Sequence, residues 1–60
     1  MKFAAVIRDR WNIIVRVEER PSKVQANRAG EFFERRNKGW WYHVAQGEES
    51  IEMYKAMINM

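Results

Sequence analysis

The chain has no cysteine, one proline, three glycines and one histidine among its 60 residues. Without cysteine there is neither a disulfide nor a thiolate metal site, so the fold must be held by packing, by a partner chain or by both. No stretch approaches the length of about 18 apolar residues typical of a transmembrane helix, and the apolar run near the N-terminus is too short for a secretory signal. We therefore expect a cytoplasmic protein that makes no membrane contact.

Residues that carry catalysis are also scarce. His43 is the single candidate base, and the two serines, Ser22 and Ser50, both stand where a helix is expected to begin. A hydrolytic triad needs a nucleophile, a base and an orienting group held together, and a metal site needs several clustered ligands. The sequence has neither pattern and no glycine-rich phosphate loop. We expect a protein without enzymatic activity, cofactor or metal.

The length and composition indicate one small folded domain, residues 1–60. Its core must be marginal, because a chain of this size leaves much of its surface in water. The composition is nevertheless that of a folded protein, with 47% hydrophobic and 32% charged residues. The net charge of +3 and the pI of about 9.7 favour polyanionic partners mildly, and they are also ordinary for a small soluble domain.

Hydrophobic alternation and turn signals divide the chain into five elements. Ser22 and Gln25 form a capping-box pattern that marks the start of the first helix, and Asn37 or Gly39 is expected to end it in the left-handed conformation. In chain order the predicted elements are a strand over Lys2 to Arg8, a strand over Trp11 to Glu19, a helix over Lys23 to Arg36, a strand over Trp40 to Ala45 and a helix over Ile51 to Ile58.

This order predicts an α+β fold, a small ββαβα domain. The first two strands form a hairpin, and a right-handed crossover through the helix places the third strand beside the first, which gives a mainly antiparallel three-stranded sheet of order 2-1-3. The first helix is expected to pack on one face of the sheet. The short C-terminal helix covers an edge or the second face, or reaches a partner. Alternation in the second strand predicts one apolar face, made by Trp11, Ile13, Val15 and Val17.

The stretch RRNKGWWYHV, residues 35–44, joins basic side chains to three consecutive aromatic residues. Alternation puts Trp40 and Trp41 on opposite faces of their strand, so one belongs to the core and the other meets the last helix, a partner or solvent. An exposed Trp beside arginines is typical of protein interfaces, and it also suits stacking of an unpaired base. The simpler alternative is that glutamates balance the arginines on an ordinary solvated helix face, with His43 a half-buried strand residue.

Two functions are compatible with these features. The first is a small binding protein, a regulator or inhibitor of the size class found in phages and mobile elements, that docks on another protein through an Arg/Trp surface or an open sheet edge. The second is a module that binds RNA or single-stranded nucleic acid through a basic helix face and exposed aromatics. The modest net charge favours the first, and the small core makes a homodimer a third possibility. The candidate binding residues are Arg28, Arg35, Arg36, Lys38, Trp41 and His43.

Overall fold

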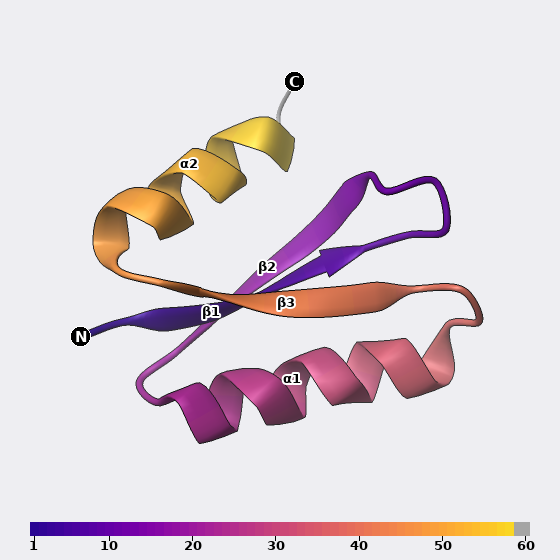
Figure 1. Cartoon of the computed structure of the whole chain (residues 1–60), viewed down its shortest axis with the longest axis horizontal. Helices are drawn as coiled ribbons and strands as arrows, with labels where there is room; N and C mark the ends of the chain where they lie inside the picture. Colours follow the sequence, from indigo (N-terminus) through magenta and orange to yellow (C-terminus); the bar gives the residue numbers. More distant parts are fainter. Residues whose placement is uncertain (59–60) are drawn as a thin grey trace.

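The computed structural model describes residues 1–58 and contains the five elements in the predicted order (Figure 1). These are β1 (Phe3–Arg8), β2 (Ile14–Arg20), α1 (Lys23–Arg36), β3 (Trp41–Gln46) and α2 (Glu48–Ile58). The three strands form one sheet of order β2-β1-β3, in which β1 is antiparallel to both neighbours. The predicted α+β fold class and strand order are confirmed.

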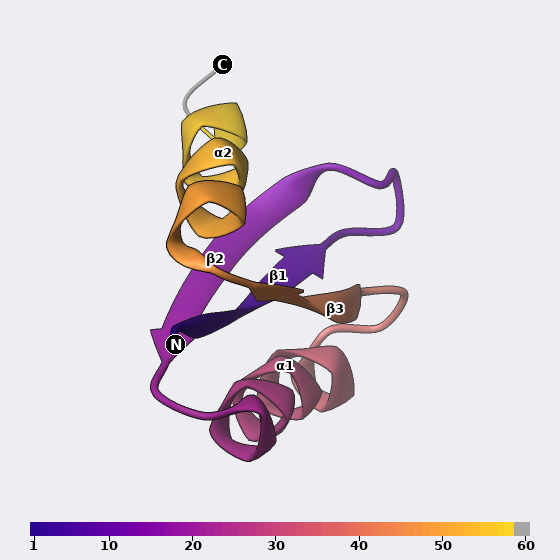
Figure 2. The same cartoon turned by 60° about the vertical axis from the view of Figure 1, so that its left-hand side comes forward.

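The sheet is the middle layer of the molecule, with α1 on one face and α2 on the other (Figures 1 and 2). Helix α1 lies mainly over β1 and β3, whereas α2 lies mainly over β2. The C-terminal helix thus covers the second face of the sheet, which is one of the three positions predicted for it. Because the two helices are offset in opposite directions, each leaves one outer strand partly uncovered. Those strands are β2 on the α1 side and β3 on the α2 side.

Local hydrogen bonds explain where α1 begins and ends. Ser22 Oγ accepts a hydrogen bond from the Gln25 backbone N–H at 3.2 Å, and the hydroxyl donates to Gln25 Oε1 at 3.3 Å. The last turn is closed by Asn37, whose backbone N–H and side-chain amide both donate to the Phe33 carbonyl. Asn37 itself is extended, and the left-handed residue of the following turn is Gly39, with φ of 88°. The capping box therefore sets the helix start as predicted.

The second strand differs from its prediction, because it contains a β-bulge. Ile7 lies opposite Arg16, but the next residue, Arg8, lies opposite Ile14, so Val15 is the extra residue. The bulge shifts the alternation: Val15 packs on the α1 side of the sheet and Val17 on the α2 side. The single apolar face predicted for this strand is wrong for that reason. Two residues of that predicted face, Trp11 and Ile13, lie before β2, which begins at Ile14, and both are exposed.

The bulge also determines what the outer strand presents to α1. Two residues that pair across β1 and β2 lie on the same face of the sheet. Glu18 pairs with Ala5, which belongs to the cluster under α1, so Glu18 also lies on the α1 side. Arg16 and Arg20 lie on the same face, two residues to either side of Glu18. A row of charged side chains therefore follows the strand that α1 leaves uncovered.

Strand β1 is buried on both faces, as expected of a central strand, and its residues 4–7 have no exposed surface. On the α1 side, Gly30 allows a close approach: a Cβ at this position would lie 2.2 Å from Cδ2 of Tyr42. On the α2 side the helix is attached through Ile51, which is 1% exposed. The Lys55 ammonium adds an ion pair with the Glu19 carboxylate at 2.6 Å. The two helices are thus attached to the sheet by different means.

Helix α2 starts three residues earlier than the sequence predicted, at Glu48 rather than Ile51. Glu48 and Glu49 form its first turn, where acidic side chains are favoured by the helix dipole. Gly47, with φ of 94°, makes the turn from β3 into the helix. Within residues 1–58, neither helix has the length and apolar character needed to cross a lipid bilayer.

Candidate functional site

The loop between β1 and β2 is held by a network centred on Asp9. One carboxylate oxygen, Oδ1, accepts hydrogen bonds from the backbone N–H groups of Trp11 and Ile13 at 2.9 and 3.0 Å. The Asp9 backbone N–H donates to the Ile13 carbonyl, and Asn12 N–H donates to the Asp9 carbonyl. Asn12 takes the left-handed conformation, with φ of 67°, which explains how a turn without glycine closes. This ordered loop presents Trp11, 72% exposed, and Ile13, 60% exposed, to solvent.

Arg8 connects this loop to strand β3. Its Nη1 donates to the Asn12 carbonyl at 3.0 Å, and its guanidinium carbon lies 5.8 Å from the centre of the Trp41 ring. Trp41 is 42% exposed because α2 leaves this part of β3 uncovered. Cation–π contacts of this kind hold the ring and the guanidinium together at the surface.

Arg10 forms a second pair of the same type, with its guanidinium carbon 5.3 Å from the Trp11 ring centre. Arg10 also lies close to Gly39 in the turn before β3: a Cβ added at Gly39 would stand 3.2 Å from the Arg10 Cβ. The β1–β2 loop and the α1–β3 turn therefore meet at one end of the molecule (Figure 1). We call this region the tryptophan surface; its residues are Arg8, Arg10, Trp11, Ile13, Trp41 and His43.

A row of rings extends the tryptophan surface towards α2. The ring centroids of Trp41 and His43 are 5.9 Å apart, and those of His43 and Tyr54 are 5.3 Å apart in an edge-to-face arrangement. Burial lowers the pKa of His43, and the positive charge of Arg8 lowers it further. The imidazole is therefore neutral at pH 7, and the positive charge of the surface comes from its arginines.

The structure separates the predicted binding residues into two groups. Trp41 and His43 lie on the α2 side of the sheet, as their pairing with Arg8 and Val6 requires. The other four lie on α1 or in the turn after it, all exposed: Arg28, Arg35, Arg36 and Lys38. The sheet stands between α1 and Trp41, so the continuous surface expected of a nucleic-acid module is not formed. As predicted, the two neighbouring tryptophans differ: Trp40 is half-buried and packs against the core under α1, while Trp41 is exposed.

The outer side of α1 has a smaller cluster of its own. The Arg36 guanidinium lies 4.2 Å from the centre of the exposed Phe32 ring. Arg35 lies 3.9 Å from the Glu31 carboxylate in an exposed i,i+4 pair. On the β3 side of the helix, burial raises the pKa of Tyr42, and the negative charges of Glu31 and Glu34 raise it further. The basic character of α1 is therefore partly cancelled by acidic residues on the β3 side.

The tryptophan surface carries side chains of the kinds that bind other molecules. It offers exposed indole rings, guanidiniums and a neutral imidazole, and the Asp9 carboxylate is engaged with backbone N–H groups. Among residues 1–58, no group of three or more His, Cys, Asp or Glu side chains is placed to hold a metal ion. Large aromatics with neighbouring arginines are the residue types that contribute most to protein–protein affinity.

Four residues of the tryptophan surface escaped the sequence prediction: Arg8, Arg10, Trp11 and Ile13. Trp11 was assigned to a strand because it fits the alternation that runs through Ile13, Val15 and Val17. Asp9 and Asn12, two turn-forming residues that bracket Trp11, predict the hairpin turn, but the alternation places Trp11 in the strand and not in that turn. A tryptophan inside such a turn must face solvent or a partner.

Comparison of the chain with models of protein families, with curated proteins and with solved structures found no match.

Proposed function

We propose that this chain is a non-enzymatic binding protein that docks on another protein through the tryptophan surface and so regulates or inhibits it. The observation that carries the proposal is the ordered loop that holds Trp11 and Ile13 outward, 72% and 60% exposed. A fold of this size has few large apolar side chains to fill its core, yet here a hydrogen-bonded loop keeps two of them in water.

The geometry is suited to tight docking for two physical reasons. Burying a whole Trp side chain removes about 150–250 Å² from water, and Trp11 and Trp41, 72% and 42% exposed, still offer part of this area to a partner. The loop is already fixed by the Asp9 hydrogen bonds, so little conformational entropy is lost when a partner binds. Trp11 and Trp41 would thus act as preorganised anchors.

Charge indicates the chemistry of the partner. Arg8 and Arg10 bring two guanidiniums to the surface, each against an indole ring. The acidic residue of this region, Asp9, directs its carboxylate into the loop backbone. The complementary partner surface is an apolar pocket or groove with carboxylates at its rim, in which each guanidinium can form a charge-assisted hydrogen bond.

The proposal is tested by affinity capture from lysate with tagged protein, with and without nuclease and at low and high salt. The test variants are Trp11→Ala and Trp41→Ala, and the matched control is Val24→Ala, an apolar side chain of α1 that is 61% exposed. We expect a defined protein that survives nuclease and high salt, is lost with either Trp variant and is retained by the control. Equal retention by all variants, or equal loss, would rule out the tryptophan surface.

A second candidate function is binding of RNA or single-stranded nucleic acid by the outer side of α1. The observation in its favour is the stacked pair Arg36 and Phe32, with Arg28 and Arg35 nearby on the same helix. Aromatic rings and arginines together bind unpaired bases and phosphates. The measurement is fluorescence anisotropy with a labelled single-stranded RNA: this function predicts binding that weakens steeply with salt and is lost in Arg35→Ala/Arg36→Ala, whereas Trp11→Ala has no effect.

A further inference from the structure

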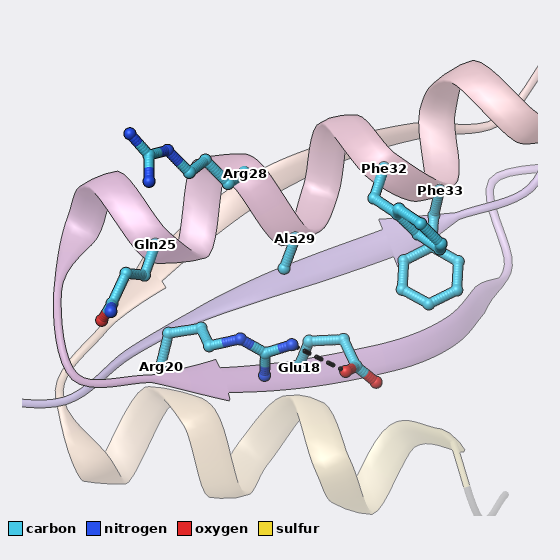
Figure 3. A pocket seen from close by; sticks show the side chains of 7 residues that line it. All are labelled: Glu18, Arg20, Gln25, Arg28, Ala29, Phe32 and Phe33. Atoms are coloured by element: carbon cyan, nitrogen blue, oxygen red, sulfur yellow. Dashed lines mark hydrogen bonds and ion pairs between the residues drawn. The ribbon is translucent and has the colours of Figure 1, made fainter.

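A second open surface lies on the other face of the sheet, in the groove between β2 and α1 (Figure 3). The groove has a volume of about 450 Å³. Strand β2 contributes Glu18 and Arg20, and helix α1 contributes Arg28, Phe32 and Phe33. It exists because α1 is displaced towards β3 and because the bulge at Val15 turns charged residues of β2 to this side.

The two ends of the groove differ in chemistry. At one end Phe32 and Phe33 meet edge to face, with ring centroids 5.2 Å apart, and the Arg16 guanidinium lies 4.8 Å from the centre of the Phe33 ring. Towards the other end Arg20 leaves β2 below α1, and its guanidinium reaches back along the strand to Glu18 (Figure 3). The groove therefore has an aromatic end and a basic end.

The groove carries an excess of positive charge. Glu18 lies between two guanidiniums, 2.9 Å from Arg16 and 3.3 Å from Arg20, so its carboxylate is already neutralised. Arg28 adds a third guanidinium at the rim, on an exposed side chain that points away from β2 in Figure 3. Arg20 Nη1 donates to the Glu19 carbonyl and Nη2 to the Glu18 carboxylate, which leaves the remaining N–H groups of Arg20 for a ligand. A carboxylate is the complementary group.

The outer edge of β2 suggests the form of the ligand. As an edge strand, β2 has backbone N–H and C=O groups on its outer side that no strand of the sheet satisfies. An extended peptide can pair with such an edge, and alternate side chains of that peptide then point to the same face of the sheet. Two successive groove-facing side chains are about 7 Å apart. One can reach the aromatic end while the other approaches Arg20.

We propose that this groove binds an extended acidic segment of a partner protein, in which an aromatic or aliphatic side chain and a carboxylate are separated by one residue. The apolar side chain packs against Phe32 and Phe33, and the carboxylate pairs with Arg20 and Arg28. The site is distinct from the tryptophan surface, because the sheet lies between them, and the proposal stands or falls independently of the proposed function.

The test is a titration of the ¹⁵N-labelled chain, followed by amide chemical shifts, with short acetylated and amidated peptides. The probes are Thr-Phe-Thr-Glu-Thr and its reverse, Thr-Glu-Thr-Phe-Thr, which cover both strand directions. The control peptides carry Lys in place of Glu. The protein variants are Phe32→Ala and Arg28→Ala, both at exposed positions, with Trp41→Ala as the control on the opposite face of the sheet. The same spectra report whether each variant is folded.

We expect one of the two Glu peptides to shift amides of β2 and of α1 between residues 25 and 33. Its Lys counterpart should bind about tenfold more weakly or worse, the loss typical of one charge-assisted hydrogen bond. Phe32→Ala and Arg28→Ala should weaken binding, and Trp41→Ala should leave it unchanged. The proposal is overturned if neither Glu peptide shifts these amides at millimolar concentration, if the Lys peptides bind equally well, or if the shifts centre on β3.

Discussion

The two helices cover the two faces of the same sheet in different ways. Helix α1 buries three small residues, Ala26, Ala29 and Gly30, and so lies close to β1 and β3. Helix α2 buries one large residue, Ile51, and lies over β2. An α-helix with its side chains is about 10 Å wide and strands are about 4.8 Å apart, so one helix covers about two strands. With three strands, each helix must leave part of one face open.

The difference between the two open areas shows how one sheet can offer two kinds of surface. On the α2 side, β3 presents the exposed Trp41 and the half-buried His43 beside the ordered loop that carries Trp11. On the α1 side, β2 exposes the ion-paired row around Glu18. The first area is aromatic and preorganised, and the second is basic with an aromatic end. Their positions follow from the strands on which each helix packs: β1 and β3 for α1, and β2 for α2.

The largest expected effect comes from Ile51, the buried side chain of α2. Ile51→Ala removes a side chain that is 1% exposed, and should lower the free energy of unfolding by about 3 kcal/mol, the usual cost of such a truncation. Urea denaturation followed by far-UV circular dichroism measures it. Met53→Ala, at a position of the same helix that is 54% exposed, is the control and should change the stability little. A small loss with Ile51→Ala would mean that α2 is held by other contacts.

On the α1 side the critical residue is Gly30, which lies against the Tyr42 ring. Gly30→Ala would place a Cβ 2.2 Å from the Tyr42 ring, and the helix would have to move away from the sheet. We expect a loss of about 2 kcal/mol, as is common for overpacked sites. In a Tyr42→Ala background the same change should cost much less, because the ring is gone. Equal costs in the two backgrounds would show that the close approach is not what makes glycine necessary.

The ordered loop should depend on one carboxylate. Asp9→Ala removes the acceptor of two backbone N–H groups, and should cost about 1 kcal/mol of stability. Hydrogen exchange should become faster at the amides of Trp11 and Ile13, because both lose their acceptor. Binding of the partner should weaken although both tryptophans are still present. Unchanged exchange at these amides would mean that the loop is ordered by its backbone hydrogen bonds alone.

The smallest effect is a pH dependence from His43. Its pKa in the folded chain is lowered from the ordinary value of 6.5 by burial and by Arg8. Below pH 6.5 the unfolded chain therefore takes up a proton more readily than the folded one, so stability is highest above this pH and falls as the pH drops through it. Urea midpoints measured from pH 8 to 5 should show this decline in the native chain and less of it in His43→Gln. Glu19, whose pKa is lowered by its hydrogen bond with Lys55, acts in a lower range, below 4.5.

Much of the fold could be predicted from the sequence because its signals are local. The apolar run of β1, the capping box at Ser22 and the strand formers of β3 each determine an element without reference to the rest of the chain. The bulge at Val15 could not be predicted in this way, because it arises from how β2 pairs with β1. Its consequences include the face on which Arg16, Glu18 and Arg20 lie.

The candidate site was predicted in part. Trp41 and His43 were identified from their strand, and the structure places both at the surface region described above. The arginines of α1 are grouped with them in the sequence prediction because Arg28 and Arg35 share a helix face that Arg36 and Lys38 extend towards Trp41. A helix that crosses over one face of a sheet is separated by that sheet from the outward side chains of the opposite face, and sequence distance does not reveal this. The offset of the two helices, which opens both surfaces, depends on tertiary packing alone.

The most direct test of the central claim is hydrogen–deuterium exchange of the chain, free and in complex with the protein recovered in the capture experiment. The account predicts slower exchange on binding at residues 9–13 and 41–43, with little change along the outer side of α1. Protection of residues 28–36 with an unchanged β1–β2 loop would contradict it, and would show that the partner binds the helix rather than the tryptophan surface.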